Sequence, residues 1–344
     1  MVAPIIEAKV IEKLRHMIQV SRHIVITCHV SPDGDAVGST LALCRVLRAL
    51  GKDAHVVTPD QLPRSLTFVP GSHEIVAASM QGLRARTLVA QADLVFCLDF
   101  NTLRRIDKLG DIISHSKAPR VLIDHHLYPD SGFDVAISFP HLSSTCELVW
   151  RTVMQLGYHN QLDKTACECL YVGMTTDTGN FTYSSNYPEI YEIVLDLMRH
   201  GINKEWLYNQ AMNTLSEDCM RLQSYAILEK MEVYHEQHAA LITLTLPELE
   251  RFNYKKGDTE GLVNKPLAIP DVQWTMFLRE DADKIKVSCR SQGNFGVDTI
   301  CADYFGGGGH KNAAGGEFKG SMEQCVAVFH QILQKITPPA EGDK

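Results

Sequence analysis

The first half of the chain alternates short, uninterrupted apolar runs with helix-like segments. In the first run Ile24, Val25 and Ile26 stand side by side without polar residues between them, which is typical of a strand buried on both faces. We expect strands at 23–28, 54–58, 93–99 and 120–124. We expect helices at 5–20, 36–50, 144–156 and 163–174. This order predicts an α/β domain with a doubly wound, mainly parallel sheet.

The pattern changes in the second half of the 344-residue chain, which is long enough for about two domains. We expect a helix at 216–231, strands at 238–246, 274–280 and 284–291, and a last helix at 321–336. These elements indicate a smaller C-terminal α/β domain with a mixed sheet. The domain boundaries that follow are 1–195 for the first domain, 196–215 for a linker, 216–337 for the second domain and 338–344 for a disordered tail.

Potential metal ligands follow three of the expected strands. The stretch "HVSPDGDAVGS" forms a loop between a strand and a helix, and the later strands end in "LDF" and "DHH". A further aspartate follows the helix-like "ACECLYVG". Because the carboxyl ends of parallel strands lie along one edge of a sheet, we expect these side chains to come together. They are His29, Asp33, Asp35, Asp99, Asp124, His125, His126 and Asp177.

The charge of this group favours bound cations. Asp33, Asp35, Asp99 and Asp177 carry four negative charges, which two divalent ions would neutralise. Carboxylates with a few imidazoles suit Mn²⁺ or Mg²⁺ better than structural zinc. Two such ions about 3.5–4 Å apart are the usual arrangement for phosphoryl hydrolysis. Taken singly, an aspartate or histidine after a strand is more often a turn or cap residue, and the argument depends on all four segments together.

Bulk properties limit the partners of the chain. The net charge of −8 does not favour non-specific binding of long nucleic acid. The ten cysteines contain no C-x-x-C pair, so we interpret them as reduced core residues. No apolar stretch approaches the length of a membrane span, and the N-terminus is an amphipathic helix rather than a signal peptide. We therefore expect a cytoplasmic protein that does not bind membranes.

The second half contains a glycine-rich stretch, "FGGGGHKNAAGG", with six glycines in twelve residues. Glycine lets the backbone approach an anion closely and offer its N–H groups, although a flexible hairpin is the alternative. Arg290 suits bidentate phosphate recognition and shares one strand face with Lys286 and Ser288. The candidate substrate-binding residues are Asn264, Ser288, Arg290, Gly307, Gly308, Gly309, His310 and Lys311.

These motifs, in this order, resemble the DHH–DHHA1 phosphoesterase family and its nano-RNase/pAp-phosphatase (NrnA-like) branch. The similarity covers residues 20–336 and includes "TTDTGNF", "GLVNKPLAI" and "KVSCRS". It implies that residues 1–195 form the catalytic DHH domain and residues 216–337 a substrate-binding DHHA1 domain.

The resemblance also implies roles for single residues. His29, Asp33 and Asp99 would hold one metal, and Asp35, Asp99, His125 and Asp177 would hold the other, with Asp99 bridging. His126 would act on the scissile phosphate as a general acid or electrostatic stabiliser. Asp124 would orient the histidines.

The function that the resemblance implies is a Mn²⁺-dependent phosphodiesterase. Its substrates would be nano-RNA, other short single-stranded RNA or DNA, dinucleotides such as pApA and pGpG, and pAp, giving 5′-mononucleotides and AMP. Two alternatives stay open, namely an inorganic pyrophosphatase or exopolyphosphatase and a non-catalytic nucleotide-binding regulator. The sequence leaves the oligomeric state open, with a homodimer among the states considered.

Overall fold

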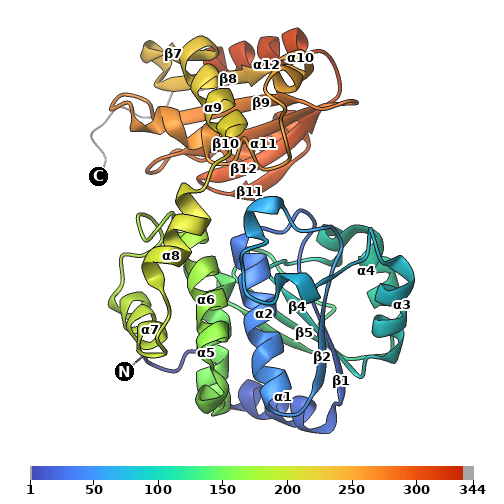
Figure 1. The fold of residues 1–344 in the computed structure, drawn as a ribbon. Coiled ribbons are helices and arrows are strands. Elements are labelled where there is room, and N and C mark those ends of the chain that lie inside the picture. Colours follow the sequence, from blue (N-terminus) through green and yellow to red (C-terminus); the bar gives the residue numbers. More distant parts are fainter. Residues whose placement is uncertain (1, 336–344) are drawn as a thin grey trace. The chain divides into compact units, whose positions relative to one another are not determined.

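The computed structural model describes residues 2–335, which divide into two compact units. The N-terminal unit ends at Thr214 and the C-terminal unit begins at Leu215 (Figure 1). No helix within the described part of the chain is long and apolar enough to cross a membrane.

The N-terminal unit is built around a six-stranded sheet in the order β3-β2-β1-β4-β5-β6, in which every neighbouring pair is parallel. Its strands are β1 His23–Thr27, β2 Asp53–Thr58, β3 Val76–Ala77, β4 Leu94–Leu98, β5 Arg120–Asp124 and β6 Val135–Ser138. Its α-helices are α1 Ala8–Val20, α2 Gly34–Ala49, α3 Gly82–Gln91, α4 Asp107–Ser114, α5 Thr145–Leu156, α6 Lys164–Asp177, α7 Pro188–Arg199 and α8 Lys204–Tyr208. Shorter helical turns are η1 Arg64–Leu66, η2 Ser72–Glu74, η3 Leu103–Ile106, η4 His159–Gln161 and the π-helical η5 Asn209–Asn213.

Helices cover both faces of this sheet, as the all-apolar strands require. One core packs α1, α2, α5, α6 and α7 against one face, and it includes Ile24 and Phe96 of the central strands. Helices α3 and α4 cover the opposite face (Figure 1), and the other core there includes Val25 and Val95. Successive residues of a strand point to opposite faces, so each apolar run supplies both cores at once.

Helices α2 and α6 pack unusually closely because glycines stand at their contact. A β-carbon on Gly38 would lie 2.4 Å from the carbonyl oxygen of Cys169, and one on Gly34 would lie 2.3 Å from Oγ1 of Thr176. A β-carbon on Gly173 of α6 would lie 2.9 Å from Oδ1 of Asp35 on α2 and 2.2 Å from Sγ of Cys146 on α5. Any larger side chain at these positions would push the helices apart.

The C-terminal unit contains a second six-stranded sheet, in the order β11-β12-β10-β9-β8-β7. Only the β8–β9 pair is parallel, so the sheet is mixed. The strands are β7 Met231–Tyr234, β8 Ala239–Leu244, β9 Trp274–Glu280, β10 Ile285–Ser291, β11 Gly308–His310 and β12 Ala313–Phe318. The helices are α9 Glu217–Glu229, α10 Leu246–Arg251, α11 Asp298–Phe305 and α12 Met322–Lys335, with the short turns η6 His235–Gln237 and η7 Leu262–Ala268.

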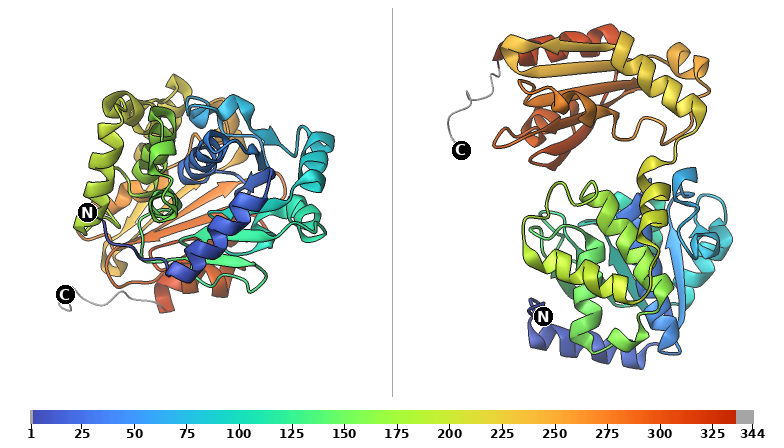
Figure 2. Two further views of the ribbon diagram at one scale, coloured as in Figure 1. Left: turned by 90° about the horizontal axis from the view of Figure 1, so that it is seen from below. Right: turned by 60° about the vertical axis from the view of Figure 1, so that its left-hand side comes forward.

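Two apolar clusters form the core of this unit, one on each face of its sheet. Figure 2 shows the sheet and the helices of this unit in two further views. Helices α11 and α12 pack on one face, and α9, α10 and η7 pack on the other. On strand β10, Val287 and Cys289 are buried, while Ser288 and Arg290, which alternate with them, are only half-buried. This alternation leaves a polar row on β10.

The expected fold class is confirmed, since the first sheet is parallel and doubly wound and the second is smaller and mixed. The expected reduced cysteines are confirmed too, because all ten are free and buried. Sequence reasoning missed several elements, namely β3, β6, β7, β11, β12, α3, α4, α7, α8, α10 and α11. The segment 196–215 is largely helical, and the expected tail at 338–344 lies outside the described residues.

Replacing Gly38 by alanine should destabilise the protein, because its nearest obstacle is backbone that cannot rotate away. We expect a loss of about 1–3 kcal/mol in the free energy of unfolding, measured by urea denaturation. Gly82→Ala is the control, because a β-carbon there meets nothing within 4 Å and should be neutral or stabilising by up to about 1 kcal/mol. Equal stability of the two variants would contradict the close-packing account.

Candidate metal centre

The topology of the parallel sheet determines where a site can form. Strand β1 lies between β2 and β4, and in this strand order the connections from β1 and β4 lead to opposite faces of the sheet. Such a switch point opens a crevice at the carboxyl ends of the two strands. His29 follows β1, Asp99 follows β4 directly, and Asp124 ends β5, so all three stand at this edge.

Asp33 and Asp35 belong to the start of α2. The Asp33 side chain caps the helix by accepting hydrogen bonds from the amides of Asp35 (3.1 Å) and Ala36 (3.0 Å). The expectation that Asp35 lies in a loop is therefore wrong. With Asp33 as the cap, the helix begins at Gly34 and Asp35 lies in its first turn.

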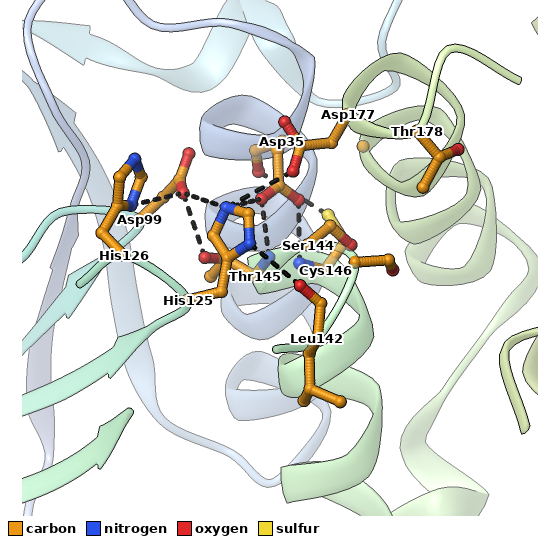
Figure 3. Close-up of polar contacts among 12 residues, drawn as sticks. Asp35, Asp99, His125, His126, Leu142, Ser144, Thr145, Cys146, Asp177 and Thr178 are labelled. Carbon is orange, nitrogen blue, oxygen red and sulfur yellow. Dashed lines mark hydrogen bonds and ion pairs between the residues drawn. The ribbon is translucent and has the colours of Figure 1, made fainter. Parts of the chain in front are cut away.

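The buried Asp35 carboxylate also faces the N-terminus of α5. Its Oδ2 accepts from the amide of Thr145 at 2.6 Å and its Oδ1 from the amide of Cys146 at 2.8 Å (Figure 3). These are amides that a helix start leaves without an intrahelical partner, and the helix dipole favours a negative charge beside them. Asp35 is thus held by two helices at once.

Asp177 is the last residue of α6, whereas the sequence placed it just after this helix. The helix runs three residues further than expected from the sequence. Close packing of α6 on α2 brings the carboxylate to the cluster, where its Oδ2 lies 3.3 Å from Nε2 of His125 (Figure 3).

Two histidines present their Nε2 atoms to the carboxylates. His29 Nδ1 lies 2.8 Å from the carbonyl oxygen of Val30, and His125 Nδ1 lies 3.3 Å from that of Leu142. Because a carbonyl can only accept, the proton of each neutral imidazole belongs on Nδ1, and Nε2 keeps its lone pair. This is the arrangement that a metal-ligating histidine needs.

Asp99 lies at the centre of the arrangement. Its Oδ2 lies 3.3 Å from Nε2 of His29, and its Oδ1 lies 3.7 Å from Nε2 of His125. Ligand atoms converge in three overlapping groups here, namely His29, Asp33 and Asp99; Asp35, His125 and Asp177; and Asp99, His125 and His126. Oδ2 of Asp99 faces His29, while its Oδ1 faces His125.

The backbone of Asp99 is strained, with φ at 62° in the left-handed region. A non-glycine residue in this conformation costs of order 1–3 kcal/mol and persists only when its surroundings enforce it. Here the Thr145 hydroxyl donates to Oδ1 at 3.0 Å, and the amide of Asp99 donates to the carbonyl of Ile123 at 3.2 Å.

His126 differs from its neighbour. Its Nδ1 lies 2.8 Å from Oδ1 of the fully buried Asp124, so the proton on this nitrogen is held by a carboxylate. The sequence assigned Asp124 to orient both histidines. In the structure Asp124 contacts only His126 of the two, whereas Nδ1 of His125 contacts the carbonyl of Leu142.

The electrostatics of the cluster show an excess of negative charge. Burial and then the Asp99 charge raise the pKa of Asp35 to about 7, and partial burial and then Asp35 raise the pKa of Asp177. Burial lowers the pKa of His125, but Asp177, Asp99 and Asp35 outweigh it and raise that pKa to about 9. The raised pKa values mean that protons neutralise part of the negative charge in the metal-free site, and bound cations could neutralise it instead. The carboxylate and imidazole donors suit Mn²⁺ or Mg²⁺.

Sequence reasoning missed the residues that support this cluster. Thr145 and Cys146 supply the amides that bind Asp35, and Ser144 caps α5 by accepting from the amide of Glu147. The signal was present, since "STCE" has the S-x-x-E spacing of a helix start. This spacing indicates the start of a helix, but it does not show that the Asp35 carboxylate lies at that helix end.

The candidate substrate residues all lie in the C-terminal unit. Ser288 and Arg290 share the polar face of β10, and Arg290 donates from Nη1 to the carbonyl of Cys289 at 2.9 Å. Asn264 is exposed on η7, which contacts β9 and β10. The hydroxyl of Thr275 donates to the carbonyl of Val263 at 2.6 Å and fixes η7 to the sheet.

The glycine-rich stretch forms the β11–β12 hairpin, whose turn consists of Lys311 and Asn312. A β-carbon on Gly307 would lie 1.9 Å from the carbonyl oxygen of Gly315, and one on Gly309 would lie 2.4 Å from that of Ala313. Strand packing thus explains these two glycines, whereas the sequence suggested that all served a ligand. A β-carbon on Gly308 meets nothing, and Gly308 is exposed.

The Lys311–Asn312 turn is held in place rather than flexible. Asn312 donates from Nδ2 to the hydroxyl of Ser291 at 2.9 Å, and Lys311 Nζ donates to Oδ1 of Asn294 at 3.2 Å. Half-buried His310 and exposed Lys311 follow the glycines. The hairpin therefore presents a cationic side chain at a fixed position.

A parallel domain with a candidate metal centre at its switch point, followed by a mixed-sheet domain, defines the class of two-domain protein to which this chain belongs. Family models match both parts: the DHH family N-terminal domain over residues 23–174 and the DHHA1 domain over residues 238–336. The chain belongs to the DHH–DHHA1 family and is an NrnA-like member of it.

Three relatives show how far the similarity extends. A crystal structure of an exopolyphosphatase-related protein from Bacteroides fragilis is 44% identical, with a TM-score of 0.94 over 97% of this chain and 98% of that one. The bifunctional oligoribonuclease and PAP phosphatase NrnA of Thermus thermophilus is 29% identical over 95% of both chains. The Bacillus subtilis protein of the same name is 27% identical, over 85% of this chain and 88% of its own.

Cation binding should release protons and strengthen as the pH rises. In the metal-free protein His125 is protonated below about pH 9 and Asp35 below about pH 7, and a metal must displace these protons. Affinity for Mn²⁺ should therefore fall as the pH is lowered through these values. Calorimetry in two buffers of different ionisation enthalpy should show release of about one proton or more near pH 7.5. An affinity that does not change with pH would contradict this electrostatic account.

Proposed function

We propose that this protein is a two-metal phosphoesterase that hydrolyses very short oligonucleotides to 5′-mononucleotides and pAp to AMP. The observation that carries the proposal is the position of Asp99, whose two oxygens face two separate groups of ligand atoms. A single carboxylate shared in this way is suited to hold two cations side by side.

The metal ligands that we propose are His29, Asp33 and Asp99 for one cation and Asp35, Asp99, His125 and Asp177 for the other. Mn²⁺ is the ion we favour, with Mg²⁺ the alternative. When bound, such ions supply Lewis-acid chemistry by offsetting charge on a phosphoryl group and lowering the pKa of a water nucleophile. The donor set fits them, because four carboxylates supply the charge that two divalent ions balance.

His126 is the group that we propose for proton transfer. Hydrolysis adds the oxygen of water to phosphorus and returns a proton to the departing ribose oxygen. Asp124 binds the Nδ1 proton of His126, which fixes the orientation of the ring. The other nitrogen of the ring, Nε2, can then donate its proton to the leaving oxygen.

The C-terminal unit is proposed to bind the rest of the substrate. Arg290 and Ser288 lie on the polar face of β10, with Asn264 on the neighbouring η7. Gly307, Gly308 and Gly309 lead to His310 and Lys311 at the hairpin turn. A guanidinium, backbone amides and an ammonium together suit the phosphate or base of a short nucleotide. Residues 1–195 would supply catalysis and residues 216–337 substrate binding.

The names of the relatives support this substrate class. Those from Thermus thermophilus and Bacillus subtilis are called oligoribonuclease and PAP phosphatase, and they match nearly the whole chain. Ten buried free thiols favour a reducing compartment, and we propose the cytoplasm. A homodimer stays a prediction.

A second candidate is hydrolysis of polyphosphate or pyrophosphate, because the 44% identical relative is called exopolyphosphatase-related. The direct test incubates the Mn²⁺-loaded protein with pApA, pGpG, pAp, a 5-mer, a 24-mer, polyphosphate and pyrophosphate. We expect mononucleotides from the dinucleotides, AMP from pAp, and little cleavage of the 24-mer. Turnover of polyphosphate or pyrophosphate alone would overturn the proposal in favour of the second candidate.

Replacing His126 by glutamine should slow dinucleotide hydrolysis about 10²- to 10⁴-fold, the usual scale for loss of an acid–base group. Metal content should stay that of the wild type, because none of the proposed metal ligands is removed. Asp124→Asn is the companion variant, which keeps an acceptor for that nitrogen and should lose less activity. Loss of one metal ion from His126→Gln, measured by mass spectrometry, would make His126 a ligand instead.

Replacing Arg290 by alanine should separate substrate binding from chemistry. We expect kcat/KM for pApA to fall about 10- to 150-fold, because a charge-assisted bond to phosphate contributes about 1.5–3 kcal/mol. Hydrolysis of bis-p-nitrophenyl phosphate, which needs no second contact, should stay near the wild-type rate. Lys284→Ala is the control, since Lys284 pairs on the surface with Glu317 at 2.7 Å. Equal losses on both substrates would show that Arg290 acts in the chemistry.

A further inference from the structure

A second group of metal-ligating side chains lies in the N-terminal unit, apart from the site described above. It consists of His159 on η4, Asp196 on α7 and His200 directly after α7. One ligand atom from each of the three lies within 4.8 Å of the other two, and all three residues are partly exposed. Neither the proposed reaction nor the family motifs use any of them.

The position of this group separates it from the catalytic cluster. η4 leads into the start of α6 at Lys164, whereas Asp177 ends the same helix. A helix rises about 1.5 Å per residue, so these two ends of α6 lie roughly 20 Å apart. The two groups therefore cannot share an ion.

Two imidazoles and one carboxylate lie close enough together to contact one ion. Nε2 of His159 lies 3.2 and 3.1 Å from the two oxygens of Asp196. Nδ1 of His200 lies 2.9 Å from the main-chain oxygen of Asp196, so its proton belongs there and Nε2 carries the lone pair. The two rings stand nearly perpendicular with centroids 5.3 Å apart.

A further contact orients the carboxylate from behind. The indole of Trp150 on α5 donates from Nε1 to Oδ2 of Asp196 at 2.9 Å. Trp150 is buried, which fixes this donor in place. Ligating carboxylates and imidazoles in metal sites are oriented by such outer hydrogen bonds, and here two of the three residues have one.

The alternative explanation is an ordinary hydrogen-bonded ion pair, which would involve only His159 and Asp196. The chain offers a matched example on β1 and β2, where Asp53 accepts from His23 with one oxygen and from His55 with the other, both at 2.9 Å. These three described residues are not among the groups whose ligand atoms converge. The convergence of a third ligand atom therefore distinguishes the His159 group from an ordinary surface ion pair.

We propose that His159, Asp196 and His200 bind one divalent ion of the zinc class, with water completing the coordination. Two imidazoles and a carboxylate suit borderline ions, and zinc binds such a set far more tightly than Mn²⁺. The ion joins η4 to the end of α7, with α5 behind the carboxylate through Trp150. Its role is structural, since it fixes three helices at the end of α6 remote from Asp177.

The test counts zinc in a background that lacks the catalytic metals. Asp99→Asn removes the shared ligand of the catalytic cluster. This variant is treated with a chelator, mixed with stoichiometric Zn²⁺ and passed through gel filtration. Mass spectrometry should then find one zinc ion per chain. Adding Asp196→Asn or His200→Gln should reduce that to none. Adding His55→Gln should leave it unchanged. Circular dichroism confirms that each variant is folded, and Asp196→Asn still offers an oxygen to Trp150.

The proposal also predicts a thermal effect that is independent of enzymatic activity. Zinc should raise the melting temperature of Asp99→Asn, and the rise should disappear with Asp196→Asn. Zinc retained equally with and without Asp196, or zinc lost entirely on gel filtration of Asp99→Asn, would overturn the proposal. Either result would leave the catalytic assignment untouched, because that assignment is tested by turnover.

Discussion

Four aspartates held together at the edge of a buried sheet are the constraint on which the rest of this structure depends. Burial, and after it the charge of neighbouring carboxylates, raises the pKa of Asp35 and of Asp177. The protein partly offsets the repulsion with its own groups, namely His29, His125 and the α5 amides. Bound cations would neutralise the rest of the charge, so the same feature that makes the site costly also favours metal binding.

The N-terminal fold serves this arrangement in specific ways. The strand order places β1 next to β4, so that His29 and Asp99 meet at the switch point. Gly34, Gly38 and Gly173 let α2 and α6 approach closely enough for Asp35 and Asp177 to share His125. The left-handed backbone of Asp99 adds local strain, which is typical of functional sites and is supported by the surrounding packing.

The sequence predicted the fold class and the participants because their signals are local. Uninterrupted apolar runs identified β1, β4 and β5, and parallel strands must align their carboxyl ends. The polar face of β10 followed from the period of two. Contacts between distant segments could not be predicted, such as the bonds from Thr145 and Cys146 to Asp35 across 110 residues. The helical position of Asp177 was also missed, because the pattern of α6 fades before its last turn.

The measurement that most directly tests the shared role of Asp99 is the number of Mn²⁺ ions bound per chain, determined by equilibrium dialysis with mass spectrometry. Asparagine at position 99 tolerates the left-handed backbone and keeps the size of the side chain, so only the charge is lost. Wild-type protein and Asp53→Asn, which removes an exposed carboxylate elsewhere, should each bind two ions. Asp99→Asn should lose both at the same free concentration. Retention of two ions by Asp99→Asn would contradict the account.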